Sequence, residues 1–135
     1  MLKIKFFLLG NAFYLVIRSI YNILYNVIGG KIIMANTKVT IKVVAPVSEV
    51  YVVGSTKNLG AWDAEKAVKL DYCNECKAFY TTKMLPVGET VEFKVLASNS
   101  WDSVEKGIWG EELQNHSFVA EKGLEVVVEV SNFAK

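Results

Sequence analysis

From residue 36 onward, apolar and polar side chains alternate along the chain, and this period of two restricts the fold more than any other feature. In TKVTIKVV (37–44), Val39, Ile41 and Val43 would point to one side of an extended chain, and the polar residues between them to the other. This is the pattern of a half-buried β-strand, whose apolar face has to be covered by a second layer.

Further short segments with strand character follow up to the C-terminus, and turn-forming residues separate them. They span 48–55, 67–72, 77–85, 90–98, 116–121 and 124–133. In 90–98, Val91, Phe93 and Val95 are expected on one face, and Glu92 and Lys94 on the other. A turn is expected at 86–89, because Pro86 fixes φ and Gly88 permits a positive φ. The stretch 99–115 is expected to be irregular, and no amphipathic helix pattern occurs after residue 34. About seven short strands of this kind predict an all-β fold, an antiparallel β-sandwich.

Residues 1–33 form a hydrophobic leader that differs from the domain expected at 34–135. One interpretation is a membrane anchor at residues 6–28, or a signal peptide. Against it, polar residues such as Arg18 interrupt the apolar run, and no small-x-small cleavage site follows. If the leader is real, we expect a membrane-anchored or secreted protein.

The other interpretation is that the leader is misassigned upstream translation and that the native chain starts at Met34. The leader is rich in residues that AT-rich DNA encodes in any frame. Gly29-Gly30-Lys31 can be encoded by codons that contain a bacterial ribosome-binding sequence, at a suitable distance from Met34. In that case we expect a cytoplasmic protein with no membrane contact.

The charge distribution argues against a nucleic-acid partner. The chain carries 15 basic and 14 acidic residues. Four of the basic residues and none of the acidic ones lie in the leader, which leaves 11 against 14 and a net charge near −3 for 34–135. Binding to phosphates needs a concentrated positive face, and this part of the sequence contains no basic cluster.

The residues that carry most hydrolytic chemistry are scarce. The chain has a single histidine, His116, and lacks the spacing of a nucleophile elbow. A pair of carboxylates for glycoside hydrolysis would need a cleft, which a small sandwich rarely has. We therefore expect a protein that is not an enzyme and uses no cofactor or metal.

The only two cysteines, Cys73 and Cys76, fall in a predicted hairpin. The simplest interpretation is that Asn74 and Glu75 form the tip of a turn with a cysteine on each side. One alternative is half of a zinc site, which His116 and a carboxylate would have to complete. The other is a disulfide or redox pair.

The three tryptophans all lie in polar loops. Trp62 ends the turn-rich segment GSTKNLGAWD (54–63), and Trp101 and Trp109 lie in the polar stretch 98–116. Such residues can close the ends of a sandwich core. They can also form a sugar platform, because an indole covers the C–H face of a pyranose while neighbouring polar groups bond its hydroxyls.

The order of these motifs resembles the starch-binding domains of carbohydrate-binding module family 20. The resemblance covers about residues 37–133. It rests on VYVVGSTKNLGAWDAEKAVKL (50–70), on FYTTKMLPVGETVEFKV (79–95), and on a Trp and an Asn in the following loop. Related glycogen-binding modules match the first motif less well. The resemblance implies an immunoglobulin-like β-sandwich that holds an α-1,4-glucan between two Trp rings, helped by a Lys, a Glu and an Asn.

Carried over residue by residue, the resemblance implies these carbohydrate-binding residues: Trp62, Lys94, Trp109, Glu111 and Asn115. Trp62 is the Trp of the LG-x-W motif, Lys94 the Lys of the E-[FY]-K strand, and Trp109 the second Trp. No site position corresponds to Trp101, and the family's second sugar site has no clear match in this sequence.

The sequence departs from the family pattern after Trp109. The pattern has an acidic residue directly after this Trp, where Gly110 stands here. A one-residue insertion would bring Glu111 and Asn115 back into register with the pattern.

The sequence therefore predicts a non-catalytic module for α-1,4-glucans such as starch, glycogen and maltooligosaccharides, which serves an amylolytic enzyme or stands alone. The alternative is a β-sandwich that has lost sugar binding and acts as a protein-interaction or structural domain. The changed spacing after Trp109 favours this alternative.

Overall fold

The computed structural model of the protein describes residues 35–135. The expectations for the leader, including the anchor at 6–28 and the start at Met34, concern residues outside this range. Residues 35–135 contain no α-helix, only single-turn 3-10 helices. None of the helices described is long and apolar enough to span a membrane. The predicted all-β fold is confirmed.

The strands are short and follow one another with little helix between them. They are β1 (Asn36–Val44), β2 (Tyr51–Gly54), β3 (Val68–Lys69), β4 (Asp71–Cys73), β5 (Ala78–Pro86), β6 (Thr90–Leu96), β7 (Glu105–Lys106), β8 (His116–Val119), β9 (Glu125–Glu129) and β10 (Asn132–Phe133). The 3-10 helices are η1 (Lys57–Leu59), η2 (Ala64–Lys66) and η3 (Trp101–Ser103).

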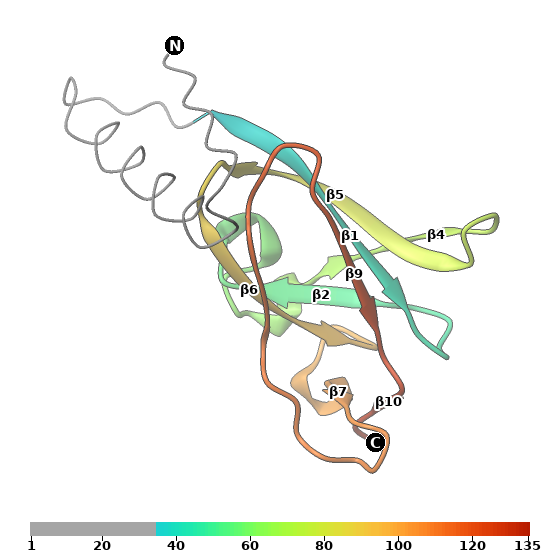
Figure 1. Ribbon diagram of the computed structural model, residues 1–135. Coiled ribbons are helices and arrows are strands. Elements are labelled where there is room, and N and C mark those ends of the chain that lie inside the picture. The colour runs from blue at the N-terminus through green and yellow to red at the C-terminus, as the bar shows by residue number, and fades with distance from the viewer. Residues whose placement is uncertain (1–34) are drawn as a thin grey trace, which may run out of the picture. The chain divides into compact units, whose positions relative to one another are not determined.

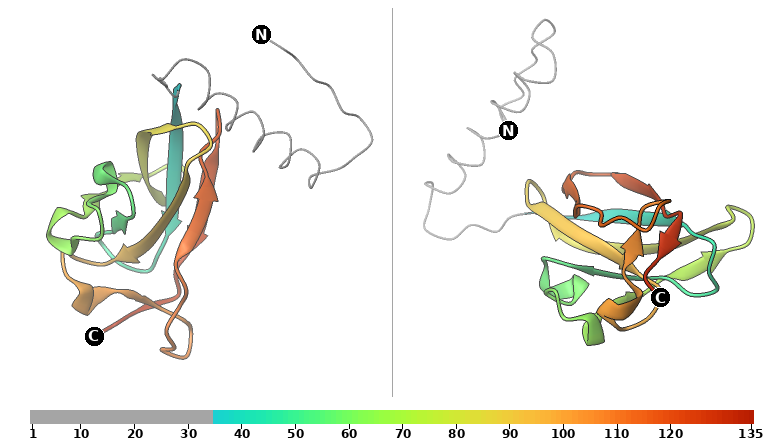
Figure 2. Two further views of the ribbon diagram at one scale, coloured as in Figure 1. Left: turned by 90° about the vertical axis from the view of Figure 1, so that its left-hand side faces the viewer. Right: turned by 90° about the horizontal axis from the view of Figure 1, so that it is seen from below.

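Two four-stranded sheets form the layers of the sandwich (Figures 1 and 2). The first has the order β4-β5-β1-β9, and the second the order β3-β2-β6-β8. A small third sheet pairs β10 with β7 and lies beside the C-terminus in Figure 1. The pairing is antiparallel except between β1 and β9, which run parallel. The sandwich is therefore mixed at one edge, where an all-antiparallel arrangement was expected.

The main core lies between these sheets and is built from the predicted apolar faces. Residues of β1 and β6 alternate between buried and more exposed positions along each strand. The inward side chains are at most 1% exposed, and they are Val39, Ile41 and Val43 from β1 and Val91, Phe93 and Val95 from β6. The alternation in sequence thus corresponds to the two faces of each strand.

A second, smaller cluster lies on the outer face of β2 and β6. Val53, Ala64 and Leu96 form this outer cluster, and each is buried. The segment between β2 and β3, which contains η1 and η2, folds back to cover it. The outer faces of β2 and β6 are consequently buried at Val53 and Leu96, and the polar loop after β2 packs on these apolar side chains.

Two predicted strands are each divided in the structure. Residues 67–72 become β3 and β4, which belong to different sheets, because the chain crosses the sandwich edge at the buried Leu70. The Leu70 N–H donates to the Val50 carbonyl at 2.9 Å. Residues 124–133 become β9 and β10, and the Val130 N–H donates to the Val44 carbonyl between them at 2.8 Å.

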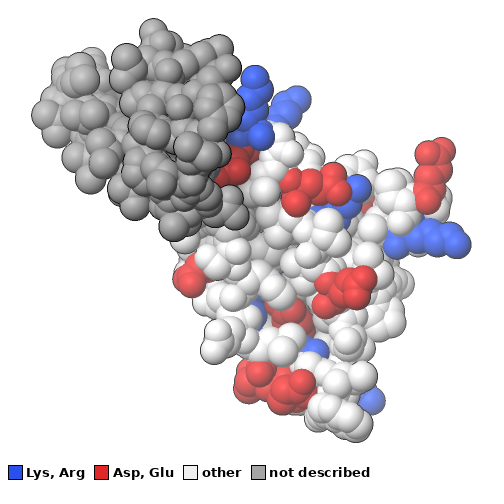
Figure 3. All heavy atoms as spheres, viewed as in Figure 1, with Lys and Arg blue, Asp and Glu red and all other residues white. Residues whose placement is uncertain are grey.

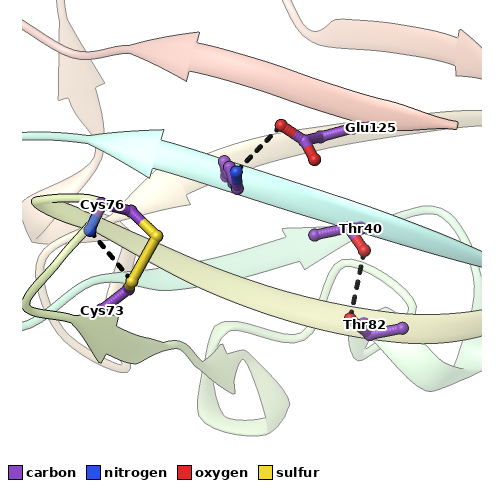
Figure 4. A network of polar contacts seen from close by, with 6 residues as sticks. Thr40, Cys73, Cys76, Thr82 and Glu125 are labelled. Atoms are coloured by element: carbon purple, nitrogen blue, oxygen red, sulfur yellow. Dashed lines mark hydrogen bonds and ion pairs between the residues drawn. A yellow bond between two sulfur atoms is a disulfide. The ribbon is translucent and has the colours of Figure 1, made fainter.

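The outer face of the β4-β5-β1-β9 sheet carries polar contacts between neighbouring strands (Figure 4). The hydroxyls of Thr40 and Thr82 lie 3.2 Å apart, and the Lys42 ammonium lies 3.0 Å from Glu125. Cys73 ends β4 and Cys76 lies in the turn before β5, within the predicted hairpin. A disulfide joins them, which is one of the alternatives that the sequence left open. In Figure 3, basic side chains do not form a continuous surface on the face shown.

Replacing Phe93 by Ala should lower the free energy of unfolding by about 3–5 kcal/mol. The ring is fully buried and contacts the rings of His116 and Phe118. Urea unfolding followed by circular dichroism measures this loss. Tyr80→Ala removes an aromatic ring that is 38% exposed and is the matched control, with a loss of at most about 1 kcal/mol. Equal losses in the two variants would contradict the assignment of Phe93 to the centre of the core.

Candidate functional site

The loop after β2 is bound closely to the second sheet at Gly54. A Cβ at this position would lie 2.7 Å from the Glu92 carbonyl oxygen and 2.9 Å from a methyl carbon of Leu59. The Trp62 N–H donates to the Gly54 carbonyl at 2.9 Å. The end of strand β2 therefore also fixes the position of Trp62, eight residues further along the chain.

Trp62 is held in an uncommon backbone conformation. Gly60, Ala61 and Trp62 have φ values of 86°, 47° and 65°, which for Ala and Trp is the sparsely populated left-handed region. The Ala61 N–H donates to the Thr56 carbonyl at 2.9 Å. Local strain of this kind persists only where surrounding contacts determine the conformation, and it is enriched at functional sites.

The Trp62 ring is half-buried, because it packs against the outer cluster while part of its surface stays accessible. Trp101 lies on η3 and is 43% exposed. The two indole rings are stacked, with centroids 6.3 Å apart and an angle of 28° between their planes. The structure therefore joins Trp62 to Trp101, the tryptophan for which the family pattern offers no position.

Polar side chains hold these two loops together. The Asn99 amide lies 3.3 Å from the carbonyl oxygens of Ala64 and Ala67, so it links the loop after β6 to η2. The Ser100 hydroxyl accepts from the Asp102 N–H at 3.1 Å and caps η3. Between the loops lies an open hollow of about 370 Å³, lined by Trp62, Asp63, Ala64, Glu65, Asn99, Ser100 and Trp101.

Lys94 projects from the outer face of β6, as expected, and is half-buried. Its register partner on β2 is Val53, a member of the outer cluster. The ammonium donates to the Leu113 carbonyl and so ties the long loop after β7 to the sheet. An ammonium has three N–H donors, and the other two can bond further acceptors.

Trp109 lies in a tight turn and is 89% exposed, the highest exposure of any large hydrophobic residue described; its neighbour Ile108 is 68% exposed. The Gly110 N–H donates to the Gly107 carbonyl at 2.9 Å. The Glu111 carboxylate accepts from the Trp109 N–H at 2.9 Å. The turn therefore holds Trp109 and Glu111 in one small unit.

The five predicted residues are thus distributed over two groups. Trp62 belongs to the stacked pair, whereas Trp109 and Glu111 belong to the turn. Lys94 is bonded to the loop that carries the turn, and Asn115 is exposed on the same loop. Among the contacts between aromatic rings of residues 35–135, the ring stacked on Trp62 is that of Trp101, and none joins Trp62 to Trp109. The set predicted from the sequence did not include Asn99 or Trp101, and the only signal for Trp101 was its position in a polar loop.

One ion pair braces the loop after β7. Lys106 and Glu112 are bonded through their side chains. The hydrogen bond and charge of Lys106, with a smaller effect of Lys94, lower the pKa of Glu112 below its ordinary value. This interaction is therefore complete above the ordinary pKa of a glutamate and is lost as the pH falls through the lowered value.

Comparison with known proteins identifies the kind of domain. The family model described as the starch binding domain of carbohydrate-binding module family 20 matches residues 36–129. The chain belongs to this family. The starch-binding domain thus spans nearly all residues that the structure describes, and its family is one of non-catalytic binding modules.

Solved structures of low sequence identity share the fold. The family 20 module of the maltotetraose-forming amylase from Pseudomonas saccharophila is 21% identical, with a TM-score of 0.51, and the match covers 69% of this chain and 99% of that one. Glucoamylases from Hypocrea jecorina and Hormoconis resinae are 23% and 18% identical, with TM-scores of 0.52 and 0.53. These two matches cover 75% of this chain but only 18% of each glucoamylase chain.

Replacing Gly60 by Ala should destabilise the domain more than replacing Gly123 by Ala. Both glycines have positive φ, which costs an L-residue about 1–2 kcal/mol. A Cβ at Gly60 would in addition lie 2.8 Å from the Lys66 carbonyl oxygen, whereas a Cβ at Gly123 meets nothing within 4 Å. Urea unfolding should separate the two variants by at least about 1 kcal/mol. Equal losses would show that the backbone at Gly60 is less constrained than described.

Replacing Lys106 by Met should raise the pKa of Glu112 toward its ordinary value, because the dominant partner of the carboxylate is removed. Titration of the Glu112 carboxyl carbon by NMR measures the shift. Lys122→Met, which removes a charge from the exposed turn before β9, is the control and should leave the pKa of Glu112 unchanged. An unchanged titration in Lys106→Met would contradict the ion pair.

Proposed function

We propose that the domain binds α-1,4-glucans, such as starch, glycogen and maltooligosaccharides, on the surface formed by Trp62 and Trp101. The observation that carries this proposal is the stacked, partly exposed pair of indoles beside an open hollow. Indole rings cover the apolar C–H faces of glucose units. Asn99, Asp63 and Glu65 lie around the same hollow and supply donors and acceptors for hydroxyls.

Trp109, predicted from the family pattern to be the partner of Trp62, is proposed as an additional contact at the end of its turn. Its exposure and its hydrogen-bonded turn suit a ring that meets a ligand without rearrangement. Lys94 and Asn115 are proposed to bond hydroxyls of the same glucan. Glu111 is proposed to act mainly by holding the turn, because its carboxylate already accepts the Trp109 N–H.

The affinity of a single site is expected to be weak, roughly micromolar to millimolar, because the hollow is open and its rim polar. Tighter binding to a starch granule would come from avidity if several modules are tethered together. We propose that the module is not itself an enzyme. An amylolytic enzyme is the proposed partner, since the similar glucoamylase chains are about five times longer than their matched segments.

Alanine substitutions of the tryptophans test the proposal. Trp62→Ala and Trp101→Ala should each weaken binding to maltoheptaose at least about tenfold, or 1.4 kcal/mol, because each removes half of the stacking surface. Trp109→Ala should have a smaller effect. Isothermal titration and co-sedimentation with insoluble starch measure binding, and circular dichroism checks the fold.

Tyr80→Ala, which removes an exposed ring from the opposite sheet, is the matched control and should bind as the unmodified protein does. If the Trp62→Ala and Trp101→Ala variants are folded and both retain full binding, the proposal that these two rings form the glucan-binding surface is wrong. The alternative, a protein-interaction domain, then gains support. If Trp109→Ala has the largest effect, the main contact moves to the turn.

A further inference from the structure

A fully buried carboxylate lies at the start of the loop that carries Trp109. The Glu105 side chain is 0% exposed. One of its oxygens accepts from the Val95 N–H at 2.9 Å, and the other lies 2.8 Å from Nε2 of His116. An ionisable group is tolerated in such a place only when its hydrogen-bonding capacity is satisfied. The position of the Glu105 carboxylate is therefore fixed by its hydrogen bonds to Val95 and His116.

The two bonded residues stand at opposite ends of one segment. Glu105 is in β7 and His116 in β8, and the ten residues between them, 106–115, include Trp109, Glu111 and Asn115. The side-chain bond between Glu105 and His116 closes this segment into a loop with joined ends. Both ends are also anchored to β6, because Glu105 accepts from Val95 and the His116 ring packs on Phe93 with centroids 5.1 Å apart.

Contacts within the closed loop 106–115 preserve its shape. Few contacts attach the middle of this loop to the sandwich. The Gly107 N–H donates to the Glu111 carbonyl at 2.9 Å, and Lys106 is bonded to Glu112. Among the described residues, the bond that holds the middle of this loop to the sheet is the one that Lys94 donates to the Leu113 carbonyl. The orientation of the Trp109 turn therefore depends chiefly on where the two ends are held.

We propose that Glu105 and His116 are positioning residues that set the orientation of the Trp109 turn and thereby its contact with a bound glucan. This inference rests on the proposed function of Trp109 as an additional contact. Neither residue touches the sugar. Each acts through the loop, so most of the effect on affinity depends on the presence of Trp109.

A binding cycle with maltoheptaose tests the proposal. His116→Ala should weaken binding at least about threefold when Trp109 is present and by a clearly smaller factor in the Trp109→Ala background, where Asn115 is the remaining contact on the loop. His116→Gln should restore affinity, because its Nε2 amide can donate to the Glu105 carboxylate. Ser117→Ala, on the same strand with an exposed side chain, is the control and should bind normally. Equal weakening in both backgrounds would overturn the positioning role.

Amide hydrogen exchange provides a readout that does not depend on sugar binding. His116→Ala should speed exchange of the Val95 amide, which donates to the Glu105 carboxylate, at least about tenfold, with no change at core amides of β1, and His116→Gln should return it to normal. Unchanged exchange would overturn the proposal. If Trp109→Ala fails to weaken glucan binding, the contact proposed for Trp109 is wrong, and exchange alone then decides whether the pair holds the loop.

Discussion

Strand β6 couples the core of the domain to the candidate binding surface, because one of its faces packs in the core and the other contacts the loops of this surface. Its inward side chains fill the space between the sheets. On the outward face, Leu96 packs in the outer cluster beneath Trp62, and Lys94 holds the loop after β7. The backbone takes part as well, since the Val95 N–H satisfies the buried Glu105. A displacement of β6 would therefore move both aromatic groups, although they lie on separate loops.

The candidate surface is held in place by contacts that oppose local preferences. Left-handed φ values at Ala61 and Trp62 are unfavourable for residues with side chains. The bonds that Ala61 and Trp62 donate to the Thr56 and Gly54 carbonyls, together with packing on the outer cluster, offset this cost. Asn99 joins the two loops that carry the stacked rings. A surface prepared in this way loses little conformational entropy on binding, which suits an open site with few contacts to a ligand.

Much of the fold follows from short-range patterns in the sequence. The alternation in 37–44 and 90–98 predicts β1 and β6 with the correct inward residues, and Pro86 and Gly88 predict the turn between β5 and β6. The strand predicted at 67–72 is divided because Leu70 is buried where the chain changes sheets, an event that local alternation does not encode. The parallel pairing of β1 with β9 is equally invisible, since pairing partners are chosen by the packing of the whole sheet.

The sequence by itself determined a β-sandwich, its apolar faces, its family resemblance and Trp62 as a candidate contact. Only the tertiary structure decided which ring stands beside Trp62. Trp101 and Trp109 both lie in polar loops, and their spacing along the chain does not distinguish them. Their positions depend on non-local contacts, the Asn99 bonds to η2 for Trp101 and the Glu105–His116 pair for Trp109. Loop residues are placed by such contacts between distant segments, whereas strands follow from the alternation of neighbouring side chains.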